Sequence, residues 1–176
     1  MKFLIILSVM FLLVACQSSL IESNHVYLKP GSHSTIEITQ PLDVYPNFSR
    51  AFLQGGEVIS PEKLDLYRVN CEVEINTVFE TQQIIAPGKF NITAISQEES
   101  PIVMLKPVML ASLNLASTPT DVKQFFRFHL SAQDPDSKSQ VRALTCRGIQ
   151  ANHASALLPT FEQIQAATGS YIKINL

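Results

Sequence analysis

The sequence predicts a mainly β domain, an antiparallel β-sandwich or barrel of short strands with one short C-terminal helix. Apolar and polar residues alternate along several stretches, most clearly along residues 69–76, and this period of two is typical of half-buried strands. Turn pairs such as Gly55-Gly56 and Pro87-Gly88 separate the stretches. One helical turn is possible after the cap Ser60, with Pro61 at its first position, but a longer helical pattern follows only near the end of the chain.

The first strands are predicted by alternation and by the turns that end them. Residues 35–39 alternate and predict a strand that ends before Pro41. Residues 48–54 predict a second strand, and Gly55-Gly56 supplies a tight turn toward a third. The alternation along residues 69–76 predicts a strand that points Cys71 into the core. We expect the opposite face of this strand, which carries two glutamates, to be exposed to solvent.

Two further hairpins are expected in the middle of the chain. Residues 78–85 and 89–96 flank the Pro87-Gly88 turn and predict an antiparallel pair. An apolar run at 102–110 follows, and its Pro107 confines it to a sheet edge or interrupts it.

The second of these hairpins covers residues 125–147 around a polar loop. A register with Phe128 opposite Leu144 and Phe126 opposite Cys146 gathers apolar side chains on one face. This register also turns Cys146 inward.

The predicted helix is delimited by its caps. Thr160 can cap its free amides, Gln163 can complete a capping box, and Gly169 ends it. Ile164 falls on the expected core face, and residues 171–175 alternate again as a last strand.

The N-terminus has the pattern of a secretory signal peptide. One cation, Lys2, precedes an apolar segment of about a dozen residues, whereas a membrane-spanning helix needs about 20. The ending Leu13-Val14-Ala15-Cys16 resembles the bacterial lipobox, which implies that Cys16 is acylated and becomes the first mature residue. The alternative is an ordinary signal peptide that carries a cysteine near its cleavage site.

This resemblance divides the chain into three parts and suggests a location. We expect a lipoprotein signal peptide at 1–15, a lipidated N-terminus and tether at 16–34, and a single β-rich periplasmic domain at 35–176. In such lipoproteins an Asp after the Cys is the inner-membrane retention signal, and Gln17 stands here instead. The resemblance therefore favours the periplasmic side of the outer membrane over the inner membrane.

Composition is that of a folded domain without a nucleic-acid partner. The 176 residues are 46% hydrophobic and 16% charged, which suffices for a core. The formal net charge is −2, and no basic run occurs.

Three cysteines become an even count for the folded domain once Cys16 is assigned to lipid. Cys71 and Cys146 then remain, and an oxidising periplasm favours a disulfide between them. Closing a loop of about 75 residues would stabilise the domain by about 4 to 5 kcal/mol in the chain-entropy model. The alternatives are two separate buried thiols or, less consistent with the motifs, a Cys-His catalytic pair.

The sequence predicts no enzyme, no cofactor and no metal site. Its four histidines are scattered, without ligand spacing, and nucleotide and hydrolase motifs are missing. Glu72 and Glu74 share one strand face and could serve as acid and base of a glycan hydrolase. Carboxylates of any wet sheet face show the same spacing, and we prefer that explanation.

Five arginines are candidates for binding an anion, such as a lipid phosphate or a peptidoglycan carboxylate. They are Arg50, Arg68, Arg127, Arg142 and Arg147. The alternative, which we favour, is that they pair across strands with glutamates such as Glu37, Glu72, Glu74 and Glu80.

Short segments of the domain also resemble small uncharacterised envelope lipoproteins of Gram-negative bacteria. They include residues 52–56, the strand with Cys71, the Pro87-Gly88 turn, residues 144–146 and residues 158–161. The resemblance implies no activity and no functional residue. We therefore expect a lipid-anchored, non-catalytic structural or interaction protein with a partner in an envelope or secretion complex; the alternative is a small-ligand-binding β-barrel.

Overall fold

The computed structural model describes residues 30–101, 121–133 and 140–176. Several predicted segments lie outside these ranges: the signal peptide, most of the tether, the apolar run at 102–110 and most of the polar loop before residue 140. Residues 30–34, assigned to the tether, already contact the domain, because the carbonyl of Ser34 accepts a hydrogen bond from the amide of Ile92.

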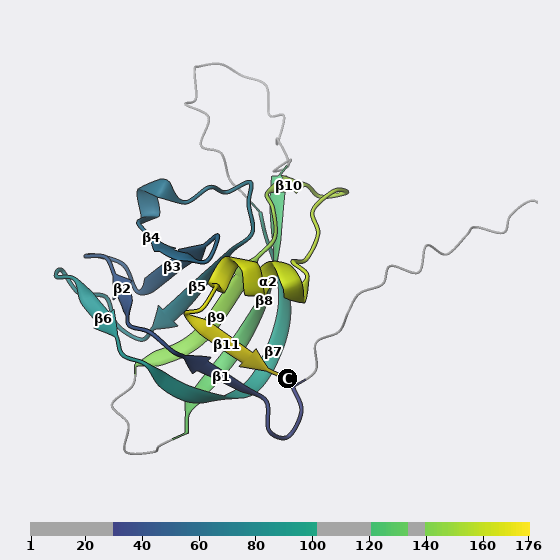
Figure 1. Cartoon of the computed structure of the whole chain (residues 1–176). Coiled ribbons are helices and arrows are strands. Elements are labelled where there is room, and N and C mark those ends of the chain that lie inside the picture. Colours follow the sequence, from purple (N-terminus) through teal and green to yellow (C-terminus); the bar gives the residue numbers. More distant parts are fainter. Residues whose placement is uncertain (1–29, 102–120, 134–139) are drawn as a thin grey trace, which may run out of the picture.

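One antiparallel nine-stranded sheet forms the body and curls on itself (Figure 1). Its strands lie in the order β11 (Ile172–Asn175), β1 (Thr35–Ile38), β7 (Gly88–Pro101), β8 (Asp121–Ala132), β9 (Val141–Arg147), β5 (Asn70–Ile75), β3 (Arg50–Gln54) and β4 (Glu57–Ile59), and β10 (Ala151–Asn152) pairs with β8. A separate two-stranded sheet joins β2 (Leu42–Val44) to β6 (Gln83–Ile85). These elements confirm the expected mainly β, antiparallel class.

Two short helical elements complete the described fold. A 3-10 turn, η2 (Pro61–Lys63), precedes β5, and the α-helix α2 (Phe161–Thr168) precedes β11. The capping box of α2 is formed as expected, because the Thr160 side chain accepts from the Gln163 amide and the Gln163 side chain accepts from the Thr160 amide. Gly169 ends the helix at a positive φ.

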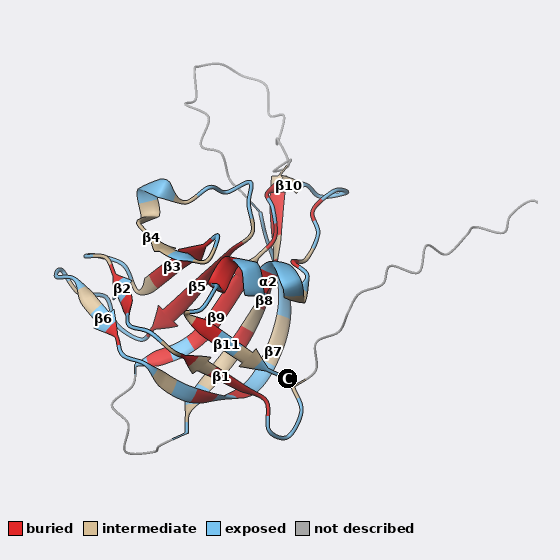
Figure 2. Cartoon of the chain, in the orientation of Figure 1, coloured by how far each residue is buried: buried red, intermediate tan, exposed pale blue. Residues whose placement is uncertain are grey.

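The hydrophobic core lies between the curled sheet and α2 (Figure 2). Ile164 of α2 is fully buried, and the helix packs against β3, β5 and β11. On the sheet, Phe128 pairs with Leu144 and Phe126 with Cys146, which confirms the predicted register of the 125–147 hairpin. The alternation of β8 and β9 thus placed the apolar side chains correctly.

The hairpin predicted around Pro87-Gly88 is wrong. β6 pairs with β2, whereas β7 pairs with β1 and β8. Leu42 and Val44 of β2 are both fully buried, and their strand satisfies its backbone against β6. Long-range burial therefore decided this pairing over the local turn signal, and β2 had not been predicted.

The prediction that one face of β5 is exposed to solvent is also wrong, because all six residues of β5 are buried. Glu74 is 1% exposed and Glu72 is 4% exposed. The side chains that cover this outer face form the first candidate site.

Candidate functional site

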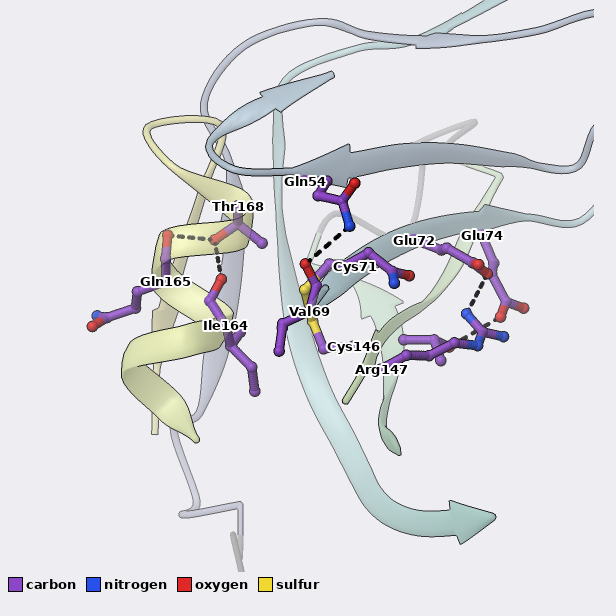
Figure 3. Close-up of a disulfide and its surroundings, with 12 residues drawn as sticks. Gln54, Val69, Cys71, Glu72, Glu74, Cys146, Arg147, Ile164, Gln165 and Thr168 are labelled. Atoms are coloured by element: carbon purple, nitrogen blue, oxygen red, sulfur yellow. Dashed lines mark hydrogen bonds and ion pairs between the residues drawn. A yellow bond between two sulfur atoms is a disulfide. The ribbon is translucent and has the colours of Figure 1, made fainter. Parts of the chain in front are cut away.

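Cys71 and Cys146 form a disulfide that joins two neighbouring strands, β5 and β9. The two residues are direct partners in the antiparallel register, and their Cα atoms are 4.1 Å apart. Figure 3 shows α2 on one side of this bond and the glutamates of β5 on the other. The pairing predicted for these cysteines is confirmed.

Glu74 is held by two arginines and a threonine. Arg127 donates from Nη1 to Oε1 at 2.9 Å and from Nη2 to Oε2 at 2.7 Å. Arg142 donates from Nε and Nη2 to Oε2 at 3.2 and 2.9 Å. The buried Thr145 hydroxyl donates to Oε1 at 3.0 Å, so each carboxylate oxygen has at least two donors.

Glu72 is held by the other two arginines of this face. Arg50 Nη1 lies 2.7 Å from Oε2, and Arg147 Nη1 lies 2.6 Å from the same oxygen. The Arg147 guanidinium also lies over the ring of Phe125, 5.2 Å from its centroid, where it gains a cation–π contact.

The strand register explains how these long side chains reach their partners. Arg50 lies opposite Glu74 but pairs with the diagonal neighbour Glu72. Arg127 on β8 lies opposite Thr145 on β9, and it crosses that strand to reach Glu74 on β5. Arg127 Nη1 also lies 3.5 Å from the Thr145 hydroxyl oxygen that it passes. We call these four arginines with Glu72 and Glu74 the arginine–glutamate cluster.

The cluster keeps Glu74 ionised despite its burial. Burial alone would raise the pKa of Glu74, but hydrogen bonds from Arg127 and Thr145, the charge of Arg127 and a hydrogen bond from Arg142 lower this pKa below its ordinary value. A carboxyl that stays ionised cannot donate a proton near neutral pH, so Glu74 is unsuited to act as a general acid.

Lys123 is a buried cation beside this cluster. It is 6% exposed, and burial lowers its pKa, as does the charge of Arg147, against opposing effects of Glu72 and Asp65. No alternation argument had singled out Lys123, since its burial depends on segments distant in sequence.

Four of the five candidate arginines therefore meet on one sheet face, and Arg68 does not join them. They pair with Glu72 and Glu74, as the favoured alternative expected, but within the described ranges they form no ion pair with Glu37 or Glu80. Four guanidinium groups face two carboxylates, so the cluster has an excess of positive charge. Arg142 and Arg50 keep the most exposed side chains, at 50% and 33%.

A second candidate site is a cavity of about 650 Å³ beside the two-stranded sheet. Its apolar walls include Ile75, Ile85, Phe90 and Val141, with Phe79 and Ile84. Three glutamines and Lys89 add polar groups. The residues that line this cavity could not be identified from the sequence, because they come from β5, β6, β7, β8 and β9 and from the segments between them.

Neither a metal-ligand cluster nor a membrane-spanning helix occurs in the described part of the chain. No three His, Cys, Asp or Glu side chains gather there in a way that could hold a metal ion. Among its helices, none is long and apolar enough to cross a membrane.

Comparison of the chain with protein-family models, with curated proteins and with solved structures finds no match.

Proposed function

We propose that this chain is a lipid-anchored, non-catalytic envelope protein that acts as a structural or interaction component at the periplasmic side of the outer membrane. The observation that carries the proposal is the Cys71–Cys146 disulfide. Such bonds persist in oxidising compartments, which include the bacterial periplasm. With these two thiols paired, Cys16 is left as the one further cysteine, and it ends the lipobox-like segment.

A non-catalytic role is supported by the state of the two glutamates. The hydrolase alternative needs one carboxyl that gives up a proton and one free to act as base or nucleophile. Glu74 has a lowered pKa and is enclosed by donors, and Glu72 is engaged by Arg50 and Arg147. Their geometry suits cross-strand support of the sheet.

An interaction role is supported by exposed apolar residues beside β5 and β9. Leu66, Tyr67 and Ile149 are 43%, 63% and 42% exposed. The Gln150 amide donates to the Leu66 carbonyl, which brings the two segments together. We propose that this apolar patch contacts a protein of an envelope or secretion complex.

The anchor and the partner can be tested separately. Cys16→Ala should release the protein from membranes and abolish lipid labelling, and retention with full labelling would refute the anchor. A photo-crosslinking residue at position 67 should give one reproducible adduct in membranes, whereas the same residue at exposed position 173 should not. The absence of an adduct at position 67 in every condition would count against the interaction role.

A second candidate function is small-ligand binding, and the cavity favours it. Its volume lies within the range of about 300 to 1,000 Å³ that is common for ligand sites. A ligand-binding domain should gain thermal stability from small apolar molecules, and the gain should rise with the logarithm of the ratio of ligand concentration to Kd once that ratio exceeds one. Failure of every such molecule to raise Tm would dismiss this candidate.

A further inference from the structure

The arginine–glutamate cluster carries more positive than negative charge. Its four guanidinium groups face two carboxylates, which leaves a surplus of two positive charges among the described residues. The neighbouring Lys123 adds a cation, but Asp65 acts on it together with Glu72 and adds an anion, so the surplus stays at two. A surplus of this size attracts a divalent anion more strongly than a monovalent one.

Two arginines of the cluster have N–H groups that no described residue accepts. Arg142 donates from Nε and Nη2 to Glu74, and its Nη1 has no described acceptor. Arg50 donates from Nη1 to Glu72, and its Nε and Nη2 are likewise without a described acceptor. The side chains of Arg142 and Arg50 are 50% and 33% exposed, so a ligand from solvent can reach them.

The strand register brings Arg50 and Arg142 to the same part of the sheet face. Arg50 on β3 lies opposite Glu74 on β5, and Ala143, the neighbour of Arg142 on β9, lies opposite Glu74 from the other side. Both arginines lean over β5, because Arg50 pairs with Glu72 and Arg142 with Glu74. Residues two apart on a strand are about 7 Å apart. One tetrahedral oxyanion can bridge two guanidinium groups at such a spacing, because its oxygens point to different corners.

The two carboxylates hold the guanidinium groups in place without presenting a negative surface. Glu72 and Glu74 are 4% and 1% exposed, and each oxygen of Glu74 already accepts from at least two donors. Figure 3 shows both glutamates on one side of β5, with Arg147 beside them. An arginine that is already held loses little side-chain entropy when a ligand binds, and its planar fork matches the oxygens of phosphate.

We propose that Arg50 and Arg142 form a site for a dianionic phosphate group, that of a phosphomonoester, on the face of β5 opposite the core. The phosphate oxygens accept from Arg142 Nη1 and from the free N–H groups of Arg50. A dianion matches the surplus of two charges, which a single carboxylate would only half compensate. The inference goes beyond the proposed function and holds with or without the anchor, a protein partner or a ligand in the cavity.

The test uses the chain from residue 16 onward with Cys16→Ala, which keeps every described residue. Calorimetric titration at constant ionic strength compares glycerol 3-phosphate, glycerol and acetate, at a pH well above the second phosphate pKa of about 6. We expect glycerol 3-phosphate to bind most tightly and glycerol not to bind. Arg142→Gln and Arg50→Gln should each weaken the phosphate about fivefold, as loss of one partly exposed ion pair does, and the double variant should abolish measurable binding.

Arg68→Gln is the matched control. Arg68 is an exposed arginine outside the cluster, so this variant changes the net charge equally but should bind glycerol 3-phosphate normally. Arg142→Lys should keep part of the affinity, because an ammonium group retains the charge but loses the planar fork.

The single variants are independent tests of the site. Glu74 keeps Arg127 when Arg142 is replaced, and Glu72 keeps Arg147 when Arg50 is replaced. If one glutamine variant fails to fold, the other and Arg142→Lys still decide the outcome.

A lipid head group and a free metabolite can both supply a phosphomonoester. Cosedimentation with phosphatidylcholine vesicles, with and without phosphatidic acid, separates these sources. Sedimentation that requires phosphatidic acid and is lost in the double variant would identify a lipid head group. Binding of glycerol 3-phosphate without such sedimentation would identify a free phosphomonoester.

The outcomes that contradict the proposal are distinct. Equal affinity for glycerol 3-phosphate and acetate would overturn the dianionic class and with it the proposal. Binding that survives the double variant, or that falls equally in Arg68→Gln, would reflect general charge attraction and overturn the site. No phosphate binding by folded protein in either experiment would overturn the proposal and leave the proposed function standing, because the anchor and the partner are tested at Cys16 and at position 67.

Discussion

Arg127 on β8 donates hydrogen bonds from both terminal nitrogens of its guanidinium group to the two carboxylate oxygens of Glu74 on β5, at 2.9 and 2.7 Å, across the intervening strand β9. Such bidentate arginine–carboxylate pairs are stronger and more directional than pairs joined by a single hydrogen bond. The Arg127 side chain is 21% exposed and that of Glu74 is 2% exposed, so the carboxylate is largely removed from water. The pair ties β8 to β5 over β9, and the stability of the sheet should depend on it.

Glu74→Gln should destabilise the fold, because the substitution leaves Arg127 without its anionic partner on β5. Removing one member of a buried ion pair typically costs about 3 to 5 kcal/mol. Urea unfolding at neutral pH measures this loss. The control is Glu57→Gln on the exposed end of β4, which should change the free energy of unfolding little. Equal losses from both would contradict a special role for Glu74.

The lowered pKa of Glu74 also predicts a pH dependence. The unfolded state binds this proton more readily than the folded state, so the stabilisation is complete above the ordinary pKa of 4.5. It is lost as the pH falls below 4.5 through the lower pKa of the folded state. The free energy of unfolding should fall in this acid range, and less steeply in Glu74→Gln. Identical acid slopes in the two proteins would argue against this assignment.

Lys123→Met should leave stability unchanged or raise it at neutral pH, because burial and Arg147 disfavour the ammonium. With its pKa lowered in the folded state, the wild-type protein should gain stability as the pH rises from that pKa toward 10.5, and the variant should lack this gain. Thermal unfolding across alkaline pH provides the measurement, with Lys173→Met as the exposed control. A strongly destabilised variant would show that Lys123 makes a favourable contact.

The disulfide should contribute substantially to stability, because it closes a separation of 75 residues. Replacing both Cys71 and Cys146 by Ala should lower the free energy of unfolding by about 2 to 5 kcal/mol. Chemical unfolding with and without a reducing agent is the measurement. Reductant should weaken the wild type and leave the double variant unaffected. A wild type insensitive to reductant, with its thiols shown to be free, would mean that the bond contributes nothing.

Gly148→Ala should destabilise the end of β9. A Cβ at this position would lie 2.1 Å from the Leu157 carbonyl oxygen, which belongs to backbone and cannot rotate away. Overpacking of this kind typically costs about 1 to 3 kcal/mol. Gly88→Ala, which meets only ordinary contacts, is the control in a thermal unfolding series. Similar Tm values for both variants would mean that the segment around Leu157 shifts freely.

The sequence alone determined features that depend on neighbours along the chain. The capping box of Thr160 and Gln163 is read within four residues, and it formed as expected. Period-two alternation turned Cys71 and Cys146 inward, and the register that set Phe126 opposite Cys146 proved correct. Local backbone geometry suffices for such features, because each strand has only two faces.

Only the tertiary structure decided which faces are covered and what covers them. Alternation separates Glu72 and Glu74 from the core side, but it does not reveal that four arginines from three other strands bury them. The same holds for the cavity and for the pairing of β2 with β6, whose partners are about 40 residues apart. These features arise from long-range contacts, in which burial and charge pairing outweigh local preference. A single sequence carries no local signal for them.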